Sequence, residues 1–437
     1  MSKDLRQRLA ELASDMIKID TSNPPGDTRE LADFIVDYLQ INGYSSDTYQ
    51  FEEGKVSVVS KVGKGSPVLI LNGHMDVVPP GDRSRWSFDP FSGQITSDGR
   101  VLGRGATDMK GGLAVATAIY VDLAQLVEKE GLGTLIYAAT ADEEVGGAKG
   151  LGALVSEGVV SGDAAIITEP SGIDTISIGE KGICQVRLTA KGRSAHGSMP
   201  ILGDNAILKA MDAIQLFSKA VKAINDRLSA EGELEDLLNR SVQTLFEEAN
   251  KRRLKLSKAE AEYVLKKITF NPGVIRGGTK VNMVPDVCEV EIDMRVPISM
   301  ASRGGQSPCS KIVSEAYELI KIDLGKEDAV KDFEIEVINE SEPNYTSPSE
   351  SIVKLVSDSV KEVLGIEPRL RIETGATDGR YLRAKGIPTV IYGPGEPFLA
   401  HAYDEYVKVE DLLTSYSVLS RAVTKFFNIP SEAHKLK

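Results

Sequence analysis

The sequence predicts an α/β protein: a mostly parallel sheet with helices on both faces, into which a smaller α+β domain is inserted. Short, wholly apolar runs alternate with helical stretches near both ends of the chain, as is typical of parallel strands buried on both faces. Between them the strands alternate apolar and polar residues, as in an antiparallel sheet with one wet face. We therefore expect a discontinuous domain over 1–181 and 344–437 and an inserted domain over 182–343.

The two ends of the chain supply the elements of the expected parallel sheet. Leucines at helical spacing predict a helix at the N-terminus, and a second helix follows over 31–39. Apolar runs bounded by turn residues predict strands over 56–62, 68–71, 134–139, 164–167 and 389–392. Helical spacing predicts further helices over 113–127, 148–155, 352–364 and 409–427.

The inserted domain has its own pattern. Alternation predicts strands over 183–189 and 287–296, a third strand over 333–338 closes the set, and helices are expected over 206–224 and 309–322. The stretch 231–268 is interpreted as an added helical pair. Ser257 and Glu260 form a capping-box signature for its second helix.

Composition narrows the function classes. The 437 residues carry 51 Lys and Arg against 64 Asp and Glu, a net charge of −13 that disfavours nucleic acid and anionic membranes as partners. No apolar run approaches the ~18 residues that a membrane-spanning helix needs, and we expect no secretory leader. The three cysteines are odd in number and show no Cys-x-x-Cys spacing. We therefore expect no disulfide framework, no cysteine-type zinc site and a reducing, cytoplasmic location.

Polar side chains of metal-binding type stand just after four predicted strands, and another stands in a glycine-rich turn before a helix. In chain order these are His74 and Asp76, Asp108 in the turn, Glu143 and Glu144, Glu169, and His401. In open α/β sheets, ligands bind at the carboxyl ends of the strands. We therefore expect these side chains to gather at one edge of the sheet.

This set indicates a metal centre. Imidazole and carboxylate groups suit Zn²⁺, Co²⁺ or Mn²⁺, and no cysteine is close enough for a closed structural zinc site. Singly, each residue has a structural interpretation, such as a helix cap or a solvated turn, and His434 in the polar tail keeps that interpretation. Together, five candidates suit two metals that share a bridging carboxylate: His74, Asp108, Glu144, Glu169 and His401.

Two acidic residues beside the ligands have other expected roles. Asp76 lies two residues after His74 in an extended segment, so the two side chains point the same way. We expect Asp76 to accept the ring N–H of His74 and so to orient it. Adjacent Glu143 and Glu144 cannot easily bind one ion from the same direction, so we expect one to be a ligand and the other a general base.

Short motifs occur in order along nearly the whole chain. They are NGHMDVVP at 72–79, GRGATDMKGG at 103–112, ADEEVGG at 141–147, TEP at 168–170, SAH at 194–196, GGT at 277–279 with Asn282 and Pro285, DMR at 293–295 and GATDGR at 375–380. Together they resemble the M20 metallopeptidase family, which includes succinyl-diaminopimelate desuccinylases, acetylornithine deacetylases, aminoacylases and glutamate carboxypeptidases. The addition over 231–268 is least like the compact members.

The resemblance implies a role for each matching residue. It implies that Asp108 bridges two divalent metals, zinc first and cobalt or manganese as alternatives. His74 and Glu169 would bind one ion, and Glu144 and His401 the other. It further implies that Glu143 is the general base of amide hydrolysis, that Asp76 orients His74, and that His196 in the inserted domain stabilises the oxyanion in the active site of a partner subunit. A homodimer is therefore expected.

The substrate is less well defined by the sequence. Arg295 and Arg380 are candidate carboxylate clamps, with Asn282 as a further substrate residue, although an ion pair between Arg295 and Asp293 is an equally good interpretation. The segment 377–380 and the glutamate at 169 favour the desuccinylase branch, whereas Lys181 stands where desuccinylases usually carry arginine.

Several functions therefore stay open. N-succinyl-L,L-diaminopimelate desuccinylase is the first hypothesis, and an acetylornithine deacetylase or a metallo-carboxypeptidase or dipeptidase is the alternative. All of these act on a small N-acyl amino acid or peptide. An inactive binding protein on the same fold is disfavoured, because Glu143 and all five candidate ligands are present.

Overall fold

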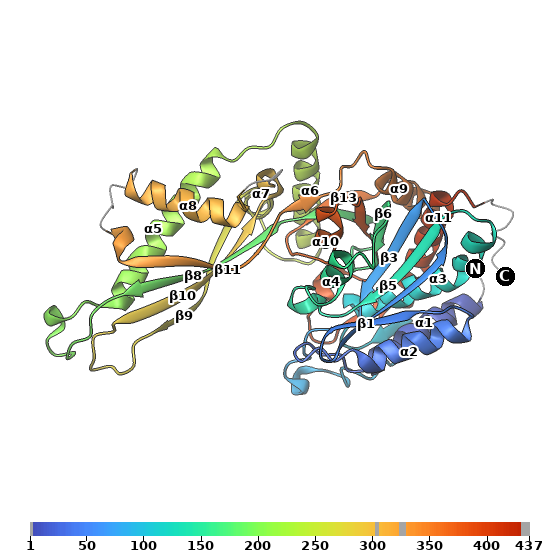
Figure 1. Cartoon of the computed structure of the whole chain (residues 1–437), viewed down its shortest axis with the longest axis horizontal. Coiled ribbons are helices and arrows are strands. Elements are labelled where there is room, and N and C mark those ends of the chain that lie inside the picture. Colours follow the sequence, from blue (N-terminus) through green and yellow to red (C-terminus); the bar gives the residue numbers. More distant parts are fainter. Residues whose placement is uncertain (1–2, 302–305, 323–328, 430–437) are drawn as a thin grey trace. The chain divides into compact units, whose positions relative to one another are not determined.

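The computed structural model describes residues 3–301, 306–322 and 329–429 (Figure 1). The chain divides into two compact units. Unit 1 comprises Met1–Ile178, Thr346–Arg371 and Thr377–Lys437, and unit 2 comprises Gly179–Tyr345 and Ile372–Ala376. These bounds lie close to the expected division at 182 and 343, except that 372–376 joins unit 2. His434 lies outside the described residues.

Unit 1 holds most of the large sheet. Within the described residues, the nine strands of this sheet are β1 (Asp47–Glu52), β2 (Lys55–Gly63), β3 (Val68–His74), β5 (Thr134–Thr140), β6 (Ala164–Ile167), β7 (Thr175–Glu180), β12 (Asn344–Tyr345), β13 (Arg369–Glu373) and β14 (Thr389–Ile391). They lie in the order β1-β2-β5-β3-β6-β14-β7-β12, and β13 pairs with β7. The four central strands β5, β3, β6 and β14 are parallel, whereas β1, β2, β7 and β12 pair antiparallel. The predicted α/β class is confirmed, but the sheet is mixed because its edges are antiparallel.

Helices cover both faces of this sheet. They are α1 (Lys3–Lys18), α2 (Arg29–Ile41), α3 (Gly111–Lys129), α4 (Leu151–Ser156), α9 (Ser351–Leu364), α10 (Gly379–Ala384) and α11 (Val409–Phe426). Helices α1, α3 and α11 pack together, with α3 against β2, β3 and β5. On the other face α4 and α10 close a core that contains Ile70, Ala138 and Ile167. A small two-stranded sheet pairs β4 (Arg100–Leu102) with β15 (Tyr406–Lys408).

Short turns link these elements. They are η1 (Arg83–Arg85), η2 (Ala106–Lys110), η3 (Glu143–Val145) and η7 (Pro397–Leu399). The segment Ala106–Lys129, which joins η2 to α3, is long and apolar enough to cross a membrane by length and composition. The expectation that no segment reaches that length is therefore wrong. Most of this segment is buried inside unit 1, so its apolar character is that of a core helix.

Unit 2 is built on a four-stranded antiparallel sheet in the order β11-β8-β10-β9. Its elements are β8 (Gly182–Lys191), η4 (Pro200–Leu202), α5 (Ala206–Arg227), α6 (Gly232–Lys251), α7 (Lys258–Lys266), β9 (Thr269–Gly277), β10 (Val287–Val296), η5 (Ile298–Met300), α8 (Pro308–Lys321), η6 (Ala329–Lys331) and β11 (Phe333–Ser341). Along β8 and β10 every second residue is buried, and these side chains pack against α5 and α8. The alternation and the added helical pair are thus observed, and Ser257 and Glu260 form the capping box of α7.

The expectation about cysteines is wrong in one respect. Cys184 of β8 and Cys309 of α8 form a disulfide with their Cα atoms 5.1 Å apart, and Cys288 is free and buried. An odd number of cysteines requires one to be left over, but it does not prevent two others from pairing. The packing of α8 on β8 brings these two together.

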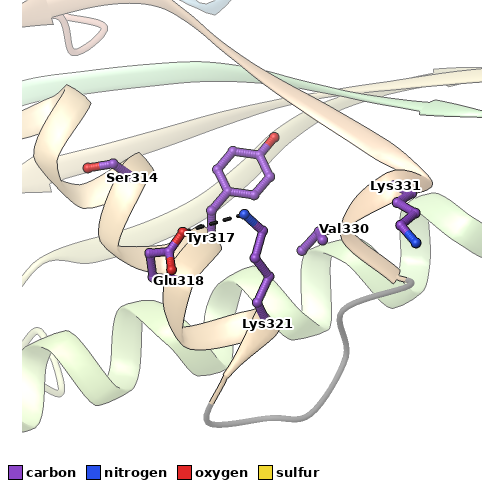
Figure 2. A pocket seen from close by; sticks show the side chains of 6 residues that line it. All are labelled: Ser314, Tyr317, Glu318, Lys321, Val330 and Lys331. Atoms are coloured by element: carbon purple, nitrogen blue, oxygen red, sulfur yellow. Dashed lines mark hydrogen bonds and ion pairs between the residues drawn. The ribbon is translucent and has the colours of Figure 1, made fainter.

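A hollow of about 540 Å³ lies in unit 2, beside α8 and η6. Figure 2 shows the side chains that line it. Glu318 and Lys321, neighbours on α8 in its lining, pair with each other at 3.4 Å. The Tyr317 hydroxyl at its wall accepts a hydrogen bond from the main-chain N–H of Ile335. No residue predicted to act in catalysis, metal binding or substrate binding lines this hollow.

Candidate metal centre

The candidate ligands of unit 1 follow strands that end level with one another. His74, the last residue of β3, pairs in register with Thr140 at the end of β5, and Asn72 pairs with Ile167 at the end of β6. Because these strands are parallel, the loops that follow β5 and β6 leave from the same edge as His74. Those loops carry Glu143, Glu144 and Glu169, as the sequence predicts.

The two carboxylate oxygens of Asp108 face two different imidazoles. Oδ1 lies 3.2 Å from Nε2 of His74, and Oδ2 lies 3.4 Å from Nε2 of His401. Nε2 of His401 also lies 3.2 Å from Oε2 of Glu144. A carboxylate with one oxygen toward each of two separate ligand groups has the arrangement that a bridge between two ions requires.

The two adjacent glutamates point to different sides of this centre. Ligand atoms of His74, Glu143 and Glu169 lie within 4.8 Å of one another, and so do those of His74, Asp108 and Glu144. Glu144 also contacts His401, whereas the nearest Glu143 oxygen is 3.9 Å from Nε2 of His74. The split that the sequence analysis expects between the two glutamates is therefore geometrically available.

Asp76 acts on the neighbouring turn as well as on His74. The ring Nδ1–H of His74 donates to the main-chain carbonyl of Asp76 at 2.9 Å, while the carboxylate of Asp76 is 3.7 Å from that nitrogen. The expected acceptor, the carboxylate, is thus replaced by the main chain of the same residue. The carboxylate instead accepts the main-chain N–H groups of Glu143 and Glu144, both at 3.1 Å, and Nδ2 of Asn23 at 2.8 Å.

The carboxylates around the two histidines favour their positively charged forms. Burial lowers the pKa of His74, but the hydrogen bond to Asp108 and the charge of Glu143 outweigh it and raise this pKa well above its usual value. Hydrogen bonds to Asp108 and Glu144 raise the pKa of His401 to about 10. Burial and the charge of Glu169 raise the pKa of Glu143 well above its usual value. The cluster therefore holds protons unless another cation enters.

The pKa values of Asp108 and Glu144 are shifted in opposite directions by their surroundings. Burial raises the pKa of Asp108, yet the hydrogen bonds and charges of His401 and His74 outweigh it and lower that pKa. Burial and the charge of Asp108 raise the pKa of Glu144. The carboxylate placed between the two imidazoles is therefore the one that most readily stays ionised, as a bridging ligand must.

The candidate substrate residues are spread over both units. In unit 1, the guanidinium of Arg380 donates to the main-chain carbonyl of Gly146 and lies 5.0 Å from the ring centre of Tyr381. In unit 2, Nε of Arg295 donates to Asp293 at 3.0 Å, which is the ion pair that the sequence analysis left open. Arg295 also lines a hollow of about 340 Å³ with Lys181, Thr269 and Thr374. An ion pair and a place in a hollow are thus both observed for Arg295.

His196 and Asn282 lie side by side in unit 2. The main-chain carbonyl of Asn282 accepts the N–H of Gly197 at 2.7 Å, and His196 pairs with Met283. Nδ1 of His196 lies 2.7 Å from the hydroxyl of Ser198, and both His196 and Asn282 are exposed. Neither residue belongs to unit 1, which holds the candidate ligands.

Two buried charged residues that bond to the loops of Asp108 and His401 were not predicted from the sequence. Arg104 and Glu405 form an ion pair of 2.5 Å, with side chains 3% and 0% exposed. Arg104 stands inside the quoted motif 103–112, and Glu405 follows His401 by four residues. Their nearness to two candidate ligands in the sequence is the signal that could have found them.

Comparison with known proteins gives a consistent family. The sequence profile of peptidase family M20/M25/M40 matches residues 70–425. A probable succinyl-diaminopimelate desuccinylase of Staphylococcus aureus (strain MSSA476) is 27% identical over 424 residues, which cover 95% of this chain and 97% of that protein. The structure of the M20 family metallo-carboxypeptidase Sso-CP2 from Sulfolobus solfataricus is 22% identical with a TM-score of 0.77, covering 98% of this chain and 100% of that chain. A dinuclear metal binding peptidase of the M20 family from Bacillus subtilis is 15% identical with a TM-score of 0.61, over 98% and 100%.

Proposed function

Because the chain belongs to peptidase family M20/M25/M40 and is thus a hydrolase of amide bonds, we propose that it uses two divalent metal ions held at the unit 1 centre. The observation that carries this proposal is the carboxylate of Asp108, whose two oxygens face two imidazoles. Zinc is the first candidate, with cobalt or manganese as alternatives. The proposed ligands are Asp108 as the bridge, His74 and Glu169 for one ion, and Glu144 and His401 for the other.

The residues present fit such a pair of ions. They offer only imidazole nitrogens and carboxylate oxygens, which are ordinary ligands of zinc, and the raised pKa values of both histidines express the same demand for positive charge. When bound, two such ions make a water more acidic and polarise the carbonyl of an amide.

Glu143 is the proposed general base. Its carboxylate lies beside His74 and Glu169 but is not needed as a ligand. It accepts a proton from the attacking water, whose oxygen bonds to the amide carbon, and returns that proton to the nitrogen as the C–N bond breaks. The products are a carboxylate and a free amine. Asp76 keeps Glu143 in place through the hydrogen bond to its main-chain N–H.

His196 is proposed to stabilise the oxyanion, from the partner subunit of a homodimer. An exposed edge of unit 2 supports such a dimer: β9 is the last strand in its sheet, and most of its side chains are exposed. Exposed apolar side chains lie on β9 and on the neighbouring α5, namely Ile275, Leu208 and Met211. A second copy of the chain would cover them. Sedimentation showing only a fully active monomer would contradict this part of the proposal.

The proposed substrate is N-succinyl-L,L-diaminopimelate, which the name of the Staphylococcus aureus relative supports. Lys181 weighs against it. Its ammonium donates to the main-chain carbonyls of Val264 and Lys267, at 2.6 and 2.7 Å, so it is held by the added helix α7 rather than presented to a ligand. Arg295, the other cation that lines the hollow, donates from Nε to Asp293, so only its remaining guanidinium nitrogens would meet a substrate carboxylate. A metallo-carboxypeptidase or dipeptidase, or an acetylornithine deacetylase, is therefore the alternative, and the name of Sso-CP2 favours the carboxypeptidase.

The deciding experiment compares hydrolysis of N-succinyl-L,L-diaminopimelate, N-acetylornithine and a panel of dipeptides. The protein is first stripped by a chelator and then reloaded with zinc or cobalt, with Glu143→Gln as the inactive control. Preference for the succinyl substrate, restored only by metal, would support the proposal in full. Preference for a peptide or an acetyl substrate would leave the metal centre and replace the substrate. Activity that persists unchanged after chelation would overturn the proposed mechanism.

A further inference from the structure

Two of the proposed ligands, Asp108 and His401, come from loops far apart in the chain, yet Oδ2 of Asp108 lies only 3.4 Å from Nε2 of His401. Asp108 lies in the turn η2 before α3, and His401 lies in the loop between η7 and β15. The main-chain φ of His401 is 64°, a left-handed conformation that side-chain-bearing residues seldom adopt without support. Something besides local sequence preference must therefore hold this pair in register.

Glu405 binds the backbone of the Asp108 loop. Its Oε1 accepts the main-chain N–H of Thr107 at 2.8 Å and that of Asp108 itself at 3.0 Å. Its Oε2 accepts the N–H of Gly105 at 3.2 Å. One carboxylate from the His401 loop thus satisfies three donors of the other loop, including the donor on the proposed bridging ligand.

Arg104 binds the backbone of the His401 loop in return. Its guanidinium donates to the main-chain carbonyl of His401 at 3.3 Å and to that of Ala402 at 3.1 Å. It also pairs with Glu405 at 2.5 Å and lies 5.1 Å from the ring centre of Trp86. The five donors of a guanidinium and its rigid plane allow all these contacts at once.

We propose that the pair Arg104–Glu405 is a reciprocal clamp that positions Asp108 and His401 for metal binding. Each loop sends one buried charge to the main chain of the other, so neither ligand can shift without breaking bonds in both loops. Neither charge is itself a proposed ligand; both act through the backbone and are positioning residues. This inference rests on the proposed metal centre. It adds two residues that are not ligands but hold the loops of two ligands in place.

The clamp predicts unequal effects on the two ions. It bonds to the loops of the bridge and of His401, whereas His74 ends β3, Glu169 follows β6, and neither receives a bond from it. Weakening the clamp should therefore lower the affinity of the ion held by Glu144 and His401 more than that of the ion held by His74 and Glu169. Loss of a residue that supports ligands lowers metal affinity by about 10- to 100-fold.

The test is a Co²⁺ titration of the full-length, chelated protein, followed by visible absorption and by calorimetry. Glu405→Gln keeps the size of the side chain, but it replaces one acceptor oxygen with an NH₂ group. That group must face either the N–H groups of Thr107 and Asp108 or those of Gly105 and Arg104. We expect the wild-type protein to bind two Co²⁺ ions tightly, and the variant to bind one tightly and the second about 10- to 100-fold more weakly.

Two further variants separate positioning from general stability. Arg104→Lys keeps a cation beside Glu405 but loses the planar fork, so we expect a smaller loss at the same ion; this variant carries the test if Glu405→Gln does not fold. The matched control is Asp122→Asn, which breaks an ion pair between α3 and α1 in which Oδ1 accepts from Arg8 at 2.9 Å. We expect this control to melt at a lower temperature with both Co²⁺ affinities unchanged.

The outcomes are distinct. Wild-type protein that binds no Co²⁺ would overturn the proposed function and the clamp with it. Wild-type protein that binds two ions, with equal affinities in Glu405→Gln and Arg104→Lys, would overturn the clamp alone. Equal weakening of both ions in the clamp variants, or weakening of one ion in Asp122→Asn as well, would assign the effect to fold stability and also overturn the clamp.

Discussion

The carboxylate of Asp76 offers the most direct test of how the centre is held. It is completely buried and accepts three hydrogen bonds: on Oδ2 from Nδ2 of Asn23 and the N–H of Glu144, and on Oδ1 from the N–H of Glu143. The substitution Asp76→Asn keeps every heavy-atom position but turns one of the two oxygens into a donor. Whichever way the amide is turned, at least one of the three donors then faces an NH₂ group.

The magnitude follows from that count. A hydrogen bond to a charged group contributes about 1.5–3 kcal/mol. If the amide keeps its oxygen at the Oδ2 position, only the bond from the Glu143 N–H is lost. We therefore expect the free energy of unfolding to fall by about 1.5–3 kcal/mol. Because that N–H belongs to the proposed general base, a shift of about 1 Å in Glu143 should lower kcat by about 100-fold.

The assay has two parts. Urea unfolding of the chelated protein measures stability, and kcat and KM are measured for the zinc-loaded protein on its best substrate. The control is Asp82→Asn, an exposed acid whose carboxylate accepts from the N–H and hydroxyl of Ser84 within its own turn. We expect it to leave both the free energy of unfolding and kcat nearly unchanged, because the side chain is exposed. Unchanged stability and kcat in Asp76→Asn would refute the argument, and lost stability with wild-type kcat would limit Asp76 to a structural role.

Three other predictions concern the base, a buried lysine and a close contact. Glu143→Gln should lower kcat by about 10²–10⁴-fold with metal content unchanged, and a variant that retains a tenth of wild-type kcat would contradict its role. Burial, with the charge of Arg295 adding to it, lowers the pKa of Lys181 from 10.5 to about 7. Between pH 7 and 10.5 the Lys181 side chain is protonated in the unfolded chain but not in the folded protein. The free energy of unfolding should therefore rise with pH in this range, by up to about 1.4 kcal/mol per pH unit. Below pH 7 this contribution is constant. Lys181→Met should remove that slope in unfolding measured at pH 7 and 9, and equal slopes would refute the shift. Gly112→Ala would place a Cβ 1.8 Å from the main-chain oxygen of Thr168, next to Glu169, so melting temperature and metal affinity should both fall; wild-type values for both would contradict the close contact.

The local pattern of the sequence predicted the elements that carry the centre. The apolar runs that became β3, β5 and β6 are buried on both faces, so their identity follows from composition alone. Because parallel strands end at a common edge, the placement of His74, Glu143, Glu144 and Glu169 near one another followed as well. The capping box of α7 was equally local.

Strands without such a pattern were missed. The strand β9 contains Pro272 and Gly273, and most of its side chains are exposed, so neither alternation nor an apolar run marks it. It is a strand because the tertiary fold pairs it with β10, and it has an open edge because it is the last strand of its sheet. The direction of β2 and β7, which run antiparallel to the central strands beside them, is likewise a matter of topology.

By itself, therefore, the sequence determined the fold class, the buried strands and the types of side chain at their ends, because burial and periodicity act over a few neighbouring residues. Only the tertiary structure decided which distant groups share a bond. It paired Cys184 with Cys309, turned the carboxylate of Asp76 from His74 to the turn of Glu143, and joined Arg104 to Glu405. Each of these contacts links segments that pattern alone cannot relate, since hydrogen bonds and ion pairs depend on positions to within an ångström, and the packing of the whole unit sets those positions.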